Sequence, residues 1–274
     1  MKTAVITGST RGLGLEMAKQ FRKKGFNVVI CGIRQENIDK AISILCDIKA
    51  PGKIIGQRCN VSSQNDVENL AATACELFDG IDIWINNAGV NQSFQLAWDL
   101  NEEEIDYLLQ VDLKGAINGT NAAMRKMISQ GYGAIYNVEG MGSNDAFQPC
   151  FSLYGTAKRA VTYFTDAVAN EIKAQKLPVL IGKLSPGIMI TDFLTSSEGK
   201  LNQTELSEKT KRIYNILGDY PDVVAAFLVS RILKNRKNGA RISWLTNQKA
   251  AAKFVTAGIS KNNYFSDMQG SEGS

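Results

Sequence analysis

The stretch that decides the fold is Ala4-Val5-Ile6-Thr7-Gly8-Ser9-Thr10-Arg11-Gly12-Leu13-Gly14, close to the start of the 274-residue chain. It begins as an apolar strand, turns through glycines with the spacing GxxxGxG, and enters a segment with apolar residues at helical intervals. Gly8 permits a tight turn, Gly12 a close approach of phosphate, and Gly14 close packing of helix on strand. A glycine turn without a ligand is the alternative, but the flanking strand and helix favour a nucleotide, because a helix N-terminus attracts phosphate. The predicted cofactor contacts in this turn are Gly8, Ser9, Thr10, Arg11, Gly12, Leu13 and Gly14.

The rest of the chain repeats the alternation of short apolar runs and longer amphipathic segments. Further apolar runs lie at 28–31, 53–56, 81–85, 133–138 and 178–181. This alternation predicts an α/β fold, a doubly wound parallel sheet of Rossmann type in three layers, with ligands at the carboxyl ends of the strands. We expect one domain over residues 1–268 and a flexible tail over 269–274. The polar segment 191–218 follows a core strand and is predicted to form a substrate lid.

Composition excludes several classes of function. The chain has no histidine, which removes the usual base of serine hydrolases and the commonest zinc ligand, so we expect no metal site. Its five cysteines form no CxxC pair and are expected to be reduced thiols. A net charge of +4 is too mild for a nucleic-acid partner, and no apolar run reaches the roughly 18 residues that span a bilayer. Because an apolar strand begins at Thr3, with no room for a leader peptide, we expect a cytoplasmic protein.

The end of the second apolar run bears on the choice of dinucleotide. An NAD site usually places a carboxylate there for the ribose hydroxyls, but this run ends Cys31-Gly32-Ile33-Arg34 without an acid. Arg34, together with Arg11 in the glycine turn, can pair with a 2′-phosphate. The pattern therefore favours NADP, the alternative being that both arginines are simply solvated.

Two later strand ends supply further candidate cofactor contacts. Asn60 and Val61 follow the third run, where Asn60 can bond the adenine amino group, although asparagine is also common in turns at such places. Asn86-Asn87-Ala88-Gly89 follows the fourth run. Its small residues permit close backbone approach, and its asparagines can brace neighbouring strand ends. We therefore expect Asn87, Ala88 and Gly89 in the wall of the cofactor site.

Of eight tyrosines, only Tyr154 is followed four residues later by a lysine, Lys158. On a helix the two side chains share a face. An ammonium beside a phenol favours the phenolate and lowers the tyrosine pKa from about 10 toward the working pH. Such a tyrosine can give a proton to a carbonyl oxygen as a hydride arrives, or remove it in reverse. A buried helix tyrosine near a surface lysine is the alternative interpretation.

The order of these motifs resembles the short-chain dehydrogenase/reductase family over essentially the whole chain. TGxxxGxG, NNAG and YxxxK are followed by Ser185-Pro186-Gly187 and Thr191. The resemblance implies that Tyr154 is the general acid/base and that Lys158 lowers its pKa and bonds the nicotinamide ribose. It also implies a homo-oligomer, dimer or tetramer. The residues implied to hold the carboxamide are Pro186, Gly187, Ile188 and Thr191.

Two positions depart from the family pattern. The family carries a catalytic serine in Asn-x-Ser-Ser, whereas this chain has Asn137-Val138-Glu139-Gly140. Ser143 is then the nearest hydroxyl that can polarise a substrate carbonyl. The family also has an asparagine in V-N-L-x-G, for which this chain has Asp112. Asp112 can still accept a hydrogen bond from a relay water, and its charge is expected to hold Lys158 protonated.

The segments 137–143, 185–192, 214–221, 244–246 and 264–265 resemble the chlorophyll b reductase branch of the family. Enzymes of that branch reduce a formyl group on a chlorophyll ring with NADPH. The resemblance implies an NADPH-dependent reductase of an aldehyde or ketone on a bulky hydrophobic small-molecule substrate. A hydroxysteroid dehydrogenase or a general carbonyl reductase is the alternative within the enzyme class. A catalytically degenerate nucleotide-binding regulator is the alternative outside it, disfavoured by the presence of both Tyr154 and Lys158.

Overall fold

A seven-stranded parallel sheet forms the centre of the computed structural model, which describes residues 1–190 and 208–257. The strand order is β3-β2-β1-β4-β5-β6-β7, so the order reverses between β1 and β4. This confirms the predicted doubly wound α/β fold, in which ligands bind beyond the carboxyl ends of the strands at the point of reversal. The strands are β1 (Thr3–Ile6), β2 (Asn27–Gly32), β3 (Ile54–Arg58), β4 (Ile83–Asn86), β5 (Ala134–Val138), β6 (Leu180–Ser185) and β7 (Ala240–Ser243).

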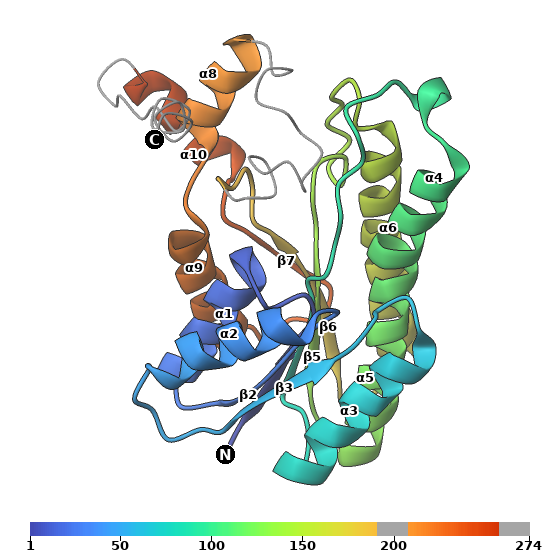
Figure 1. Cartoon of the computed structure of the whole chain (residues 1–274), viewed down its shortest axis with the longest axis vertical. Helices are drawn as coiled ribbons and strands as arrows, with labels where there is room; N and C mark the ends of the chain where they lie inside the picture. Colours follow the sequence, from blue (N-terminus) through green and yellow to red (C-terminus); the bar gives the residue numbers. More distant parts are fainter. Residues whose placement is uncertain (191–207, 258–274) are drawn as a thin grey trace.

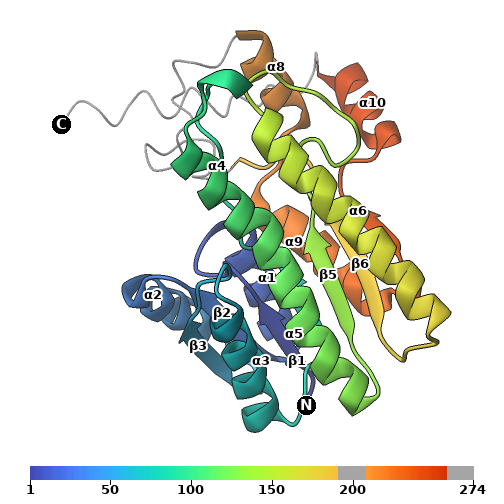
Figure 2. The ribbon, with the colours of Figure 1, turned by 90° about the vertical axis from the view of Figure 1, so that its right-hand side faces the viewer.

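Helices cover both faces of the sheet and give the three layers of Figure 1. One face carries α1 (Gly12–Lys23), α2 (Gln35–Cys46) and α9 (Pro221–Lys234), and the other carries α3 (Gln64–Phe78), α5 (Gly115–Gln130) and α6 (Ser152–Ala174). Beyond the carboxyl ends of the strands lie α4 (Glu102–Leu108), α8 (Glu208–Leu217) and α10 (Asn247–Thr256), as Figure 2 shows. No helix in the described part of the chain is long and apolar enough to cross a membrane.

The helix pair α4 and α5 is joined by a π-helical turn, η2 (Leu109–Lys114), and a short 3₁₀ turn, η1 (Ala97–Asp99), precedes α4. In η2 the side chains of Val111 and Asp112 are buried. π-helical turns are rare and occur frequently at functional sites. The π-helical turn is therefore consistent with Asp112 belonging to a functional site.

The core consists of two apolar layers, one on each face of the sheet. In β4, Ile83 and Ile85 pack into the layer beneath α1 and α9, whereas Trp84 packs into the layer beneath α3 and α5. Because both faces of the sheet are covered, the strands read as continuous apolar runs rather than as alternating ones. Residues 191–207 and 258–274 lie outside the described residues, and with them lie Thr191, most of the predicted lid and the predicted tail.

A buried hydrogen-bond network ties the carboxyl ends of β4 and β5 to α6. The side-chain oxygen of Asn86 accepts a bond from Trp84 Nε1 at 2.7 Å, and Asn86 Nδ2 donates to Asn137 Oδ1 at 2.7 Å. Asn137 Nδ2 in turn donates to Thr165 Oγ1 on α6 at 2.9 Å. The expectation that asparagines at the end of the fourth apolar run brace neighbouring strand ends is confirmed for Asn86. The same network holds the helix of Tyr154 and Lys158 against the sheet.

Asn86→Ala should lower the free energy of unfolding by about 2 to 4 kcal/mol, because several buried polar groups lose their partner at once. Urea denaturation followed by circular dichroism measures the change. Asn144→Ala, at an exposed asparagine, is the matched control. Equal unfolding free energies for the two variants would contradict a structural role of the network.

Candidate active site

The glycine turn and the segment after β4 are packed directly against each other. Gly8 has a φ of +59°, and a Cβ there would lie 2.6 Å from Ala88 Cα. Asn87 Nδ2 donates to the carbonyl oxygens of Thr7 and Gly8 at 3.0 and 2.9 Å. A Cβ on Gly14 would lie 2.5 Å from the same nitrogen. Glycine is therefore required at both positions, and Asn87 acts on the turn as a brace.

The glycine turn has the open side that a cofactor diphosphate needs. A Cβ built on Gly12, whose φ is +56°, would have no atom of residues 1–190 or 208–257 within 4 Å. Helix α1 starts at this residue, has no acid in its first turn, and receives no side-chain cap from Arg11. Its first N–H groups and its dipole are thus available for an anion. The residues present fit the diphosphate of a dinucleotide.

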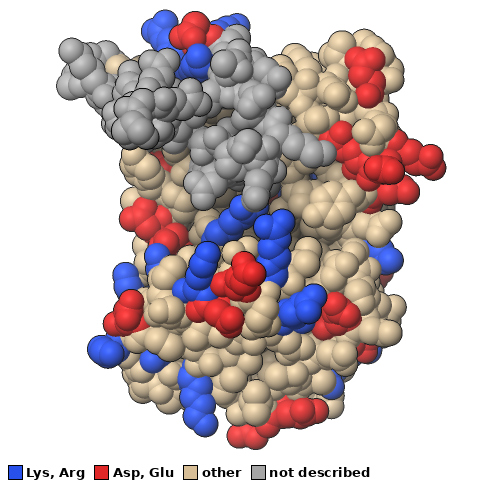
Figure 3. Space-filling view, in the orientation of Figure 1, with Lys and Arg blue, Asp and Glu red and all other residues tan. Residues whose placement is uncertain are grey.

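The adenosine end of the predicted site is formed where this turn meets β2. Ser9 Oγ accepts a bond from the Cys31 N–H at 3.0 Å, and a Cβ on Gly32 would lie 2.8 Å from the Thr10 methyl group. These contacts bring Arg11 and Arg34, the residues directly before α1 and α2, to the same edge of the sheet. Figure 3 shows Lys and Arg side chains, interspersed with acids, on the face where α1 and α2 lie.

The structure does not support the predicted bond from Asn60 to adenine. The side-chain oxygen of Asn60 accepts bonds from Ser62 N at 3.1 Å and from Ser62 Oγ at 2.7 Å. Because an amide oxygen has two lone pairs, this arrangement leaves no acceptor for an adenine amino group. The alternative interpretation, turn chemistry, describes Asn60 better. Val61 is buried, and its place in the cofactor wall stays a prediction.

Tyr154, Lys158 and Asp112 meet beside Gly89, which follows β4. Lys158 Nζ lies 2.8 Å from Asp112 Oδ2 and 5.4 Å from the centre of the Tyr154 ring. Only 7% of the Lys158 side chain and none of the Asp112 side chain is exposed. Asp112 Oδ1 accepts a bond from the Val90 N–H at 2.7 Å. A Cβ on Gly89 would lie 3.0 Å from Asp112 Oδ2, so this glycine makes room for the ion pair.

Burial reverses the pKa shift that the tyrosine–lysine spacing predicts. The Lys158 charge lowers the pKa of Tyr154, but burial is the stronger influence and, together with Asp112, raises that pKa above its ordinary value. Burial by itself lowers the pKa of Lys158, yet Asp112 and Tyr154 outweigh it and raise the pKa to about 12. Lys158 is therefore held protonated, as expected from Asp112, while Tyr154 remains a phenol at neutral pH.

The Ser143 hydroxyl is engaged with the backbone. Its Oγ accepts a bond from the Gly140 N–H at 3.2 Å and donates to the Lys158 carbonyl oxygen at 3.2 Å, and the residue is 1% exposed. A hydroxyl bonded in this way polarises no substrate carbonyl unless the turn rearranges. At the family's serine position, a Cβ on Gly140 would lie 2.3 Å from the Tyr154 hydroxyl. The Tyr154 hydroxyl thus occupies the space into which a side chain at position 140 would project.

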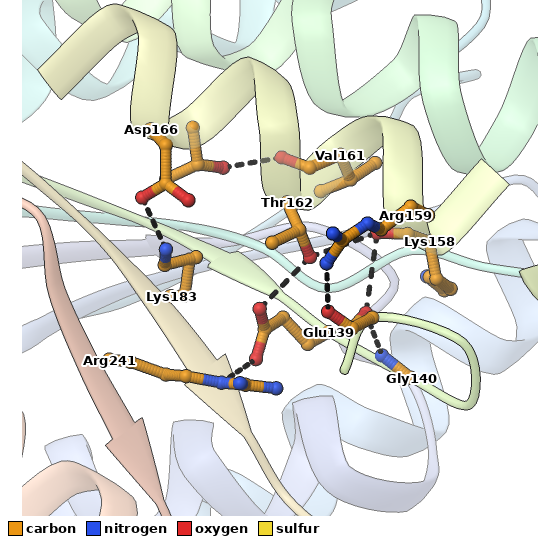
Figure 4. Close-up of polar contacts among 11 residues, drawn as sticks. Glu139, Gly140, Lys158, Arg159, Val161, Thr162, Asp166, Lys183 and Arg241 are labelled. Atoms are coloured by element: carbon orange, nitrogen blue, oxygen red, sulfur yellow. Dashed lines mark hydrogen bonds and ion pairs between the residues drawn. The ribbon is translucent and has the colours of Figure 1, made fainter. Parts of the chain in front are cut away.

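A charged group braces α6 from the side of β6 and β7 (Figure 4). Glu139 has a buried carboxylate that lies 2.6 Å from Arg241 Nε and accepts a bond from Thr162 Oγ1 at 2.9 Å. Lys183 pairs with Asp166 nearby. The sequence alone offered one signal for this group, an acid directly after an apolar strand. Its partner Arg241 lies more than a hundred residues further on, where no local sequence pattern connects it to Glu139.

The surroundings of Tyr154 are apolar and aromatic. Phe151 meets the Tyr154 ring edge-on, with centroids 6.1 Å apart, and Tyr214 of α8 is buried in the same cluster. α8 lies within the segment predicted as a lid and packs in the Tyr154 cluster, while the function of that segment as a lid stays a prediction. Ile188 also packs here, and its carbonyl oxygen accepts a bond from the N–H of Asp219, just after α8, at 3.1 Å. The members of the cluster include Val90, Phe94, Leu108, Leu109, Met141, Phe151, Leu153, Ala157, Ile188, Ile213 and Tyr214.

Residues 2–202 match the model of the short-chain dehydrogenase family, and the chain belongs to this family. No group of three or more His, Cys, Asp or Glu side chains within residues 1–190 and 208–257 is arranged to hold a metal ion. Pro186, Gly187 and Ile188 directly follow β6, at the same end of the sheet as the glycine turn, as the family pattern requires.

Three comparisons illustrate the relationship. The chain is 31% identical over 283 residues to the probable chlorophyll(ide) b reductase NYC1, chloroplastic, of Arabidopsis thaliana, covering 97% of this chain and 55% of that protein. It is 33% identical over 273 residues to the chlorophyll(ide) b reductase NOL, chloroplastic, of the same plant, covering 96% and 76%. The chain thus spans about half the length of NYC1 and about three quarters of NOL.

The third comparison concerns the fold, which resembles that of a single-site variant of actinorhodin polyketide ketoreductase with NADPH. The TM-score is 0.78 at 22% identity, over 90% of this chain and 97% of that one. At this identity the likeness extends to the fold alone.

Ser143→Ala should destabilise the protein by about 1 to 2 kcal/mol, because the hydroxyl links the turn at Gly140 to the backbone of Lys158. Chemical denaturation in urea, compared with the wild-type protein, measures the loss. An unchanged unfolding free energy would show that the hydroxyl is not needed as a brace, which would return it to the candidates for substrate contact.

Proposed function

We propose that this protein reduces an aldehyde or ketone group on a bulky hydrophobic substrate with NADPH, and that Tyr154 supplies the proton. The observation that carries the proposal is the buried group of Tyr154, Lys158 and Asp112 beside Gly89, in which Tyr154 packs in a cluster of apolar and aromatic side chains. A phenol, an ammonium and a carboxylate together at the carboxyl edge of a nucleotide-binding sheet form a proton-donating site next to a hydride donor.

The residues proposed to hold the cofactor follow β1, β2 and β6, and one more, Lys158, lies on α6. The glycine turn and the start of α1 would hold the diphosphate, Lys158 the nicotinamide ribose, and Pro186 to Ile188 the carboxamide. Arg11 and Arg34 favour NADP, because a 2′-phosphate carries charge that guanidinium groups pair with well and that an acid would repel. When bound, NADPH supplies the hydride.

The protonation state of the site suits reduction. Tyr154 is a phenol at neutral pH because burial and Asp112 raise its pKa, so it can give its proton to the carbonyl oxygen. The substrate carbon gains the hydride, the oxygen gains the phenol proton, and an alcohol results. The phenolate left behind lies beside the Lys158 ammonium, which stabilises it until solvent returns a proton. Asp112 keeps that ammonium charged throughout the cycle.

A bulky, flat, apolar substrate suits the surroundings of Tyr154. Phe151, Tyr214 and Phe94 contribute aromatic rings to the cluster, and ring faces favour stacking with a flat conjugated molecule. The curated relatives NYC1 and NOL are named for reduction of chlorophyll(ide) b. We therefore propose a formyl group on a large ring system as the first substrate to test. A hydroxysteroid or another apolar ketone would bind beside the same cluster and is the second candidate.

Tyr154→Phe should lower kcat by about 10³-fold, because the general acid is lost, while NADPH affinity stays within about 2-fold of wild type. NADPH and NADH oxidation at 340 nm is followed with formyl tetrapyrroles, ketosteroids and aromatic aldehydes, and cofactor affinity by fluorescence titration. Tyr163→Phe is the matched control, since Tyr163 lies on the same helix and is 76% exposed. A Tyr154→Phe enzyme with wild-type kcat, or a clear preference for NADH, would contradict the corresponding part of the proposal.

Asp112→Asn should move the pH profile to lower pH. Asp112 raises the pKa of both Tyr154 and Lys158, so without its charge the pair releases its first proton at lower pH. Reduction needs the phenol and should therefore decline at a lower pH than in wild type, whereas alcohol oxidation needs the phenolate and should begin at a lower pH. Profiles of kcat/KM in both directions over roughly pH 7 to 12 measure this shift. Superimposable profiles, or a shift to higher pH, would refute the role of Asp112.

A further inference from the structure

Gln92 lies six residues after the end of β4 and is 1% exposed. Its side-chain oxygen accepts a hydrogen bond from the backbone N–H of Tyr154 at 2.8 Å. Tyr154 is in the first turn of α6, where backbone N–H groups have no partner within the helix. One half of the Gln92 amide therefore caps the helix that carries the proton donor.

The other half of the amide has no such function in the described residues. Gln92 Nε2 is buried and has no hydrogen-bond partner within residues 1–190 and 208–257. The bond to Tyr154 determines which amide atom is the oxygen, because the reverse orientation would set two donors against each other. Buried donors are nearly always paired in native proteins. An acceptor supplied by a ligand would satisfy this one.

The loop around Gln92 points it toward the tyrosine. Val90 and Phe94, two residues before and after it, both pack in the apolar cluster around Tyr154. Ser93, the residue between Gln92 and Phe94, is bonded to α4 instead, and its hydroxyl donates to Glu104 Oε2 at 2.8 Å. The contacts of Val90 and Phe94, together with the bond to the Tyr154 backbone, place the Gln92 amide beside the start of α6 and the apolar cluster around Tyr154.

Neither the family's serine position nor Ser143 supplies a second donor to the substrate carbonyl in the described part of the chain. The family's serine is replaced by Gly140, against which the Tyr154 hydroxyl packs. The Ser143 hydroxyl donates to the Lys158 carbonyl oxygen and is not available in this arrangement. A carbonyl oxygen protonated by Tyr154 would thus have one donor where two are usual, unless a neighbouring group supplies the other.

We propose that Gln92 Nε2 donates a hydrogen bond to the substrate carbonyl oxygen and takes the place of the missing serine. This inference rests on the proposed function and deepens it. As the hydride reaches the carbonyl carbon, the π electron pair moves to the oxygen, which takes the proton from Tyr154. Gln92 transfers no proton. Its N–H dipole stabilises the charge that builds on that oxygen, which is where a fixed donor has most effect.

Two substitutions separate the donor from the helix cap. Gln92→Glu keeps an oxygen for the Tyr154 N–H but loses the donor while the new carboxyl group is ionised. Gln92→Met is neutral, has a similar length, and loses both. If Gln92 is a catalytic donor, both variants should lose about 10²-fold in kcat with unchanged NADPH affinity. Gln92→Glu should regain activity as the pH falls and the new carboxyl group becomes a donor.

A purely structural Gln92 predicts a different pattern. Gln92→Glu would then match wild type in kcat at every pH, and Gln92→Met would lose thermal stability without losing kcat. Either result overturns the inference. If the buried charge prevents Gln92→Glu from folding, the kcat of Gln92→Met decides, since an unchanged value there also overturns it.

Gln95→Glu is the matched control, because it introduces the same charge three residues further along the same loop at an exposed position. Its kcat and pH profile should equal those of wild type. The panel of carbonyl substrates is tested with the wild-type protein in the same assay. Absence of wild-type turnover counts against the proposed function, whereas equal kcat values for wild type and the Gln92 variants count against the role of Gln92 alone.

Discussion

The ion pair between Lys158 and Asp112 is the interaction on which the arrangement of the site depends. Its two charges are almost completely removed from water, and they lie 2.8 Å apart where α6, η2 and the segment after β4 come together. Desolvation of each charge is expensive, and loss of either partner would leave the other buried and uncompensated, at a cost of about 3 to 5 kcal/mol. The ion pair therefore holds the three segments together, because moving one of them away would leave a buried charge without its partner.

Two features of the segment after β4 are explained by this pair. Gly89 is small because the carboxylate and the ammonium occupy the space beside its Cα. The Val90 N–H faces Asp112 and satisfies the oxygen that does not face the lysine. The charge of Asp112 also changes the chemistry of the site relative to the neutral asparagine of the family pattern, because it counteracts the influence of Lys158 on the phenol. In the proposed reduction, the ammonium would then serve mainly to stabilise the phenolate once the proton has left.

The sequence predicted the fold and the main groups of the site because the signals are local. A strand, a glycine turn and a helix follow one another directly, and Tyr154 and Lys158 share a helical face by spacing alone. The sign of the Tyr154 pKa shift was not predictable in this way, since burial depends on Phe151 and on Tyr214, which is far along the chain. The Ser143 hydroxyl likewise could not be assigned from the sequence, because its direction is set by the Lys158 carbonyl oxygen of α6. Asn60 is different, because Ser62 two residues later was a readable signal of a turn.

The π-helical turn that carries Asp112 links the chemistry of the site to helical phase. Each residue in an α-helix advances the side-chain direction by about 100°, and a π turn accommodates one residue more than an α turn does. Removal of one residue between Leu109 and Lys114 would leave α4 and α5 intact as helices but rotate the carboxylate away from the lysine. The position of the Asp112 carboxylate thus depends on the number of residues in η2. Insertions and deletions within η2 should therefore be far less tolerated than point substitutions on its exposed side.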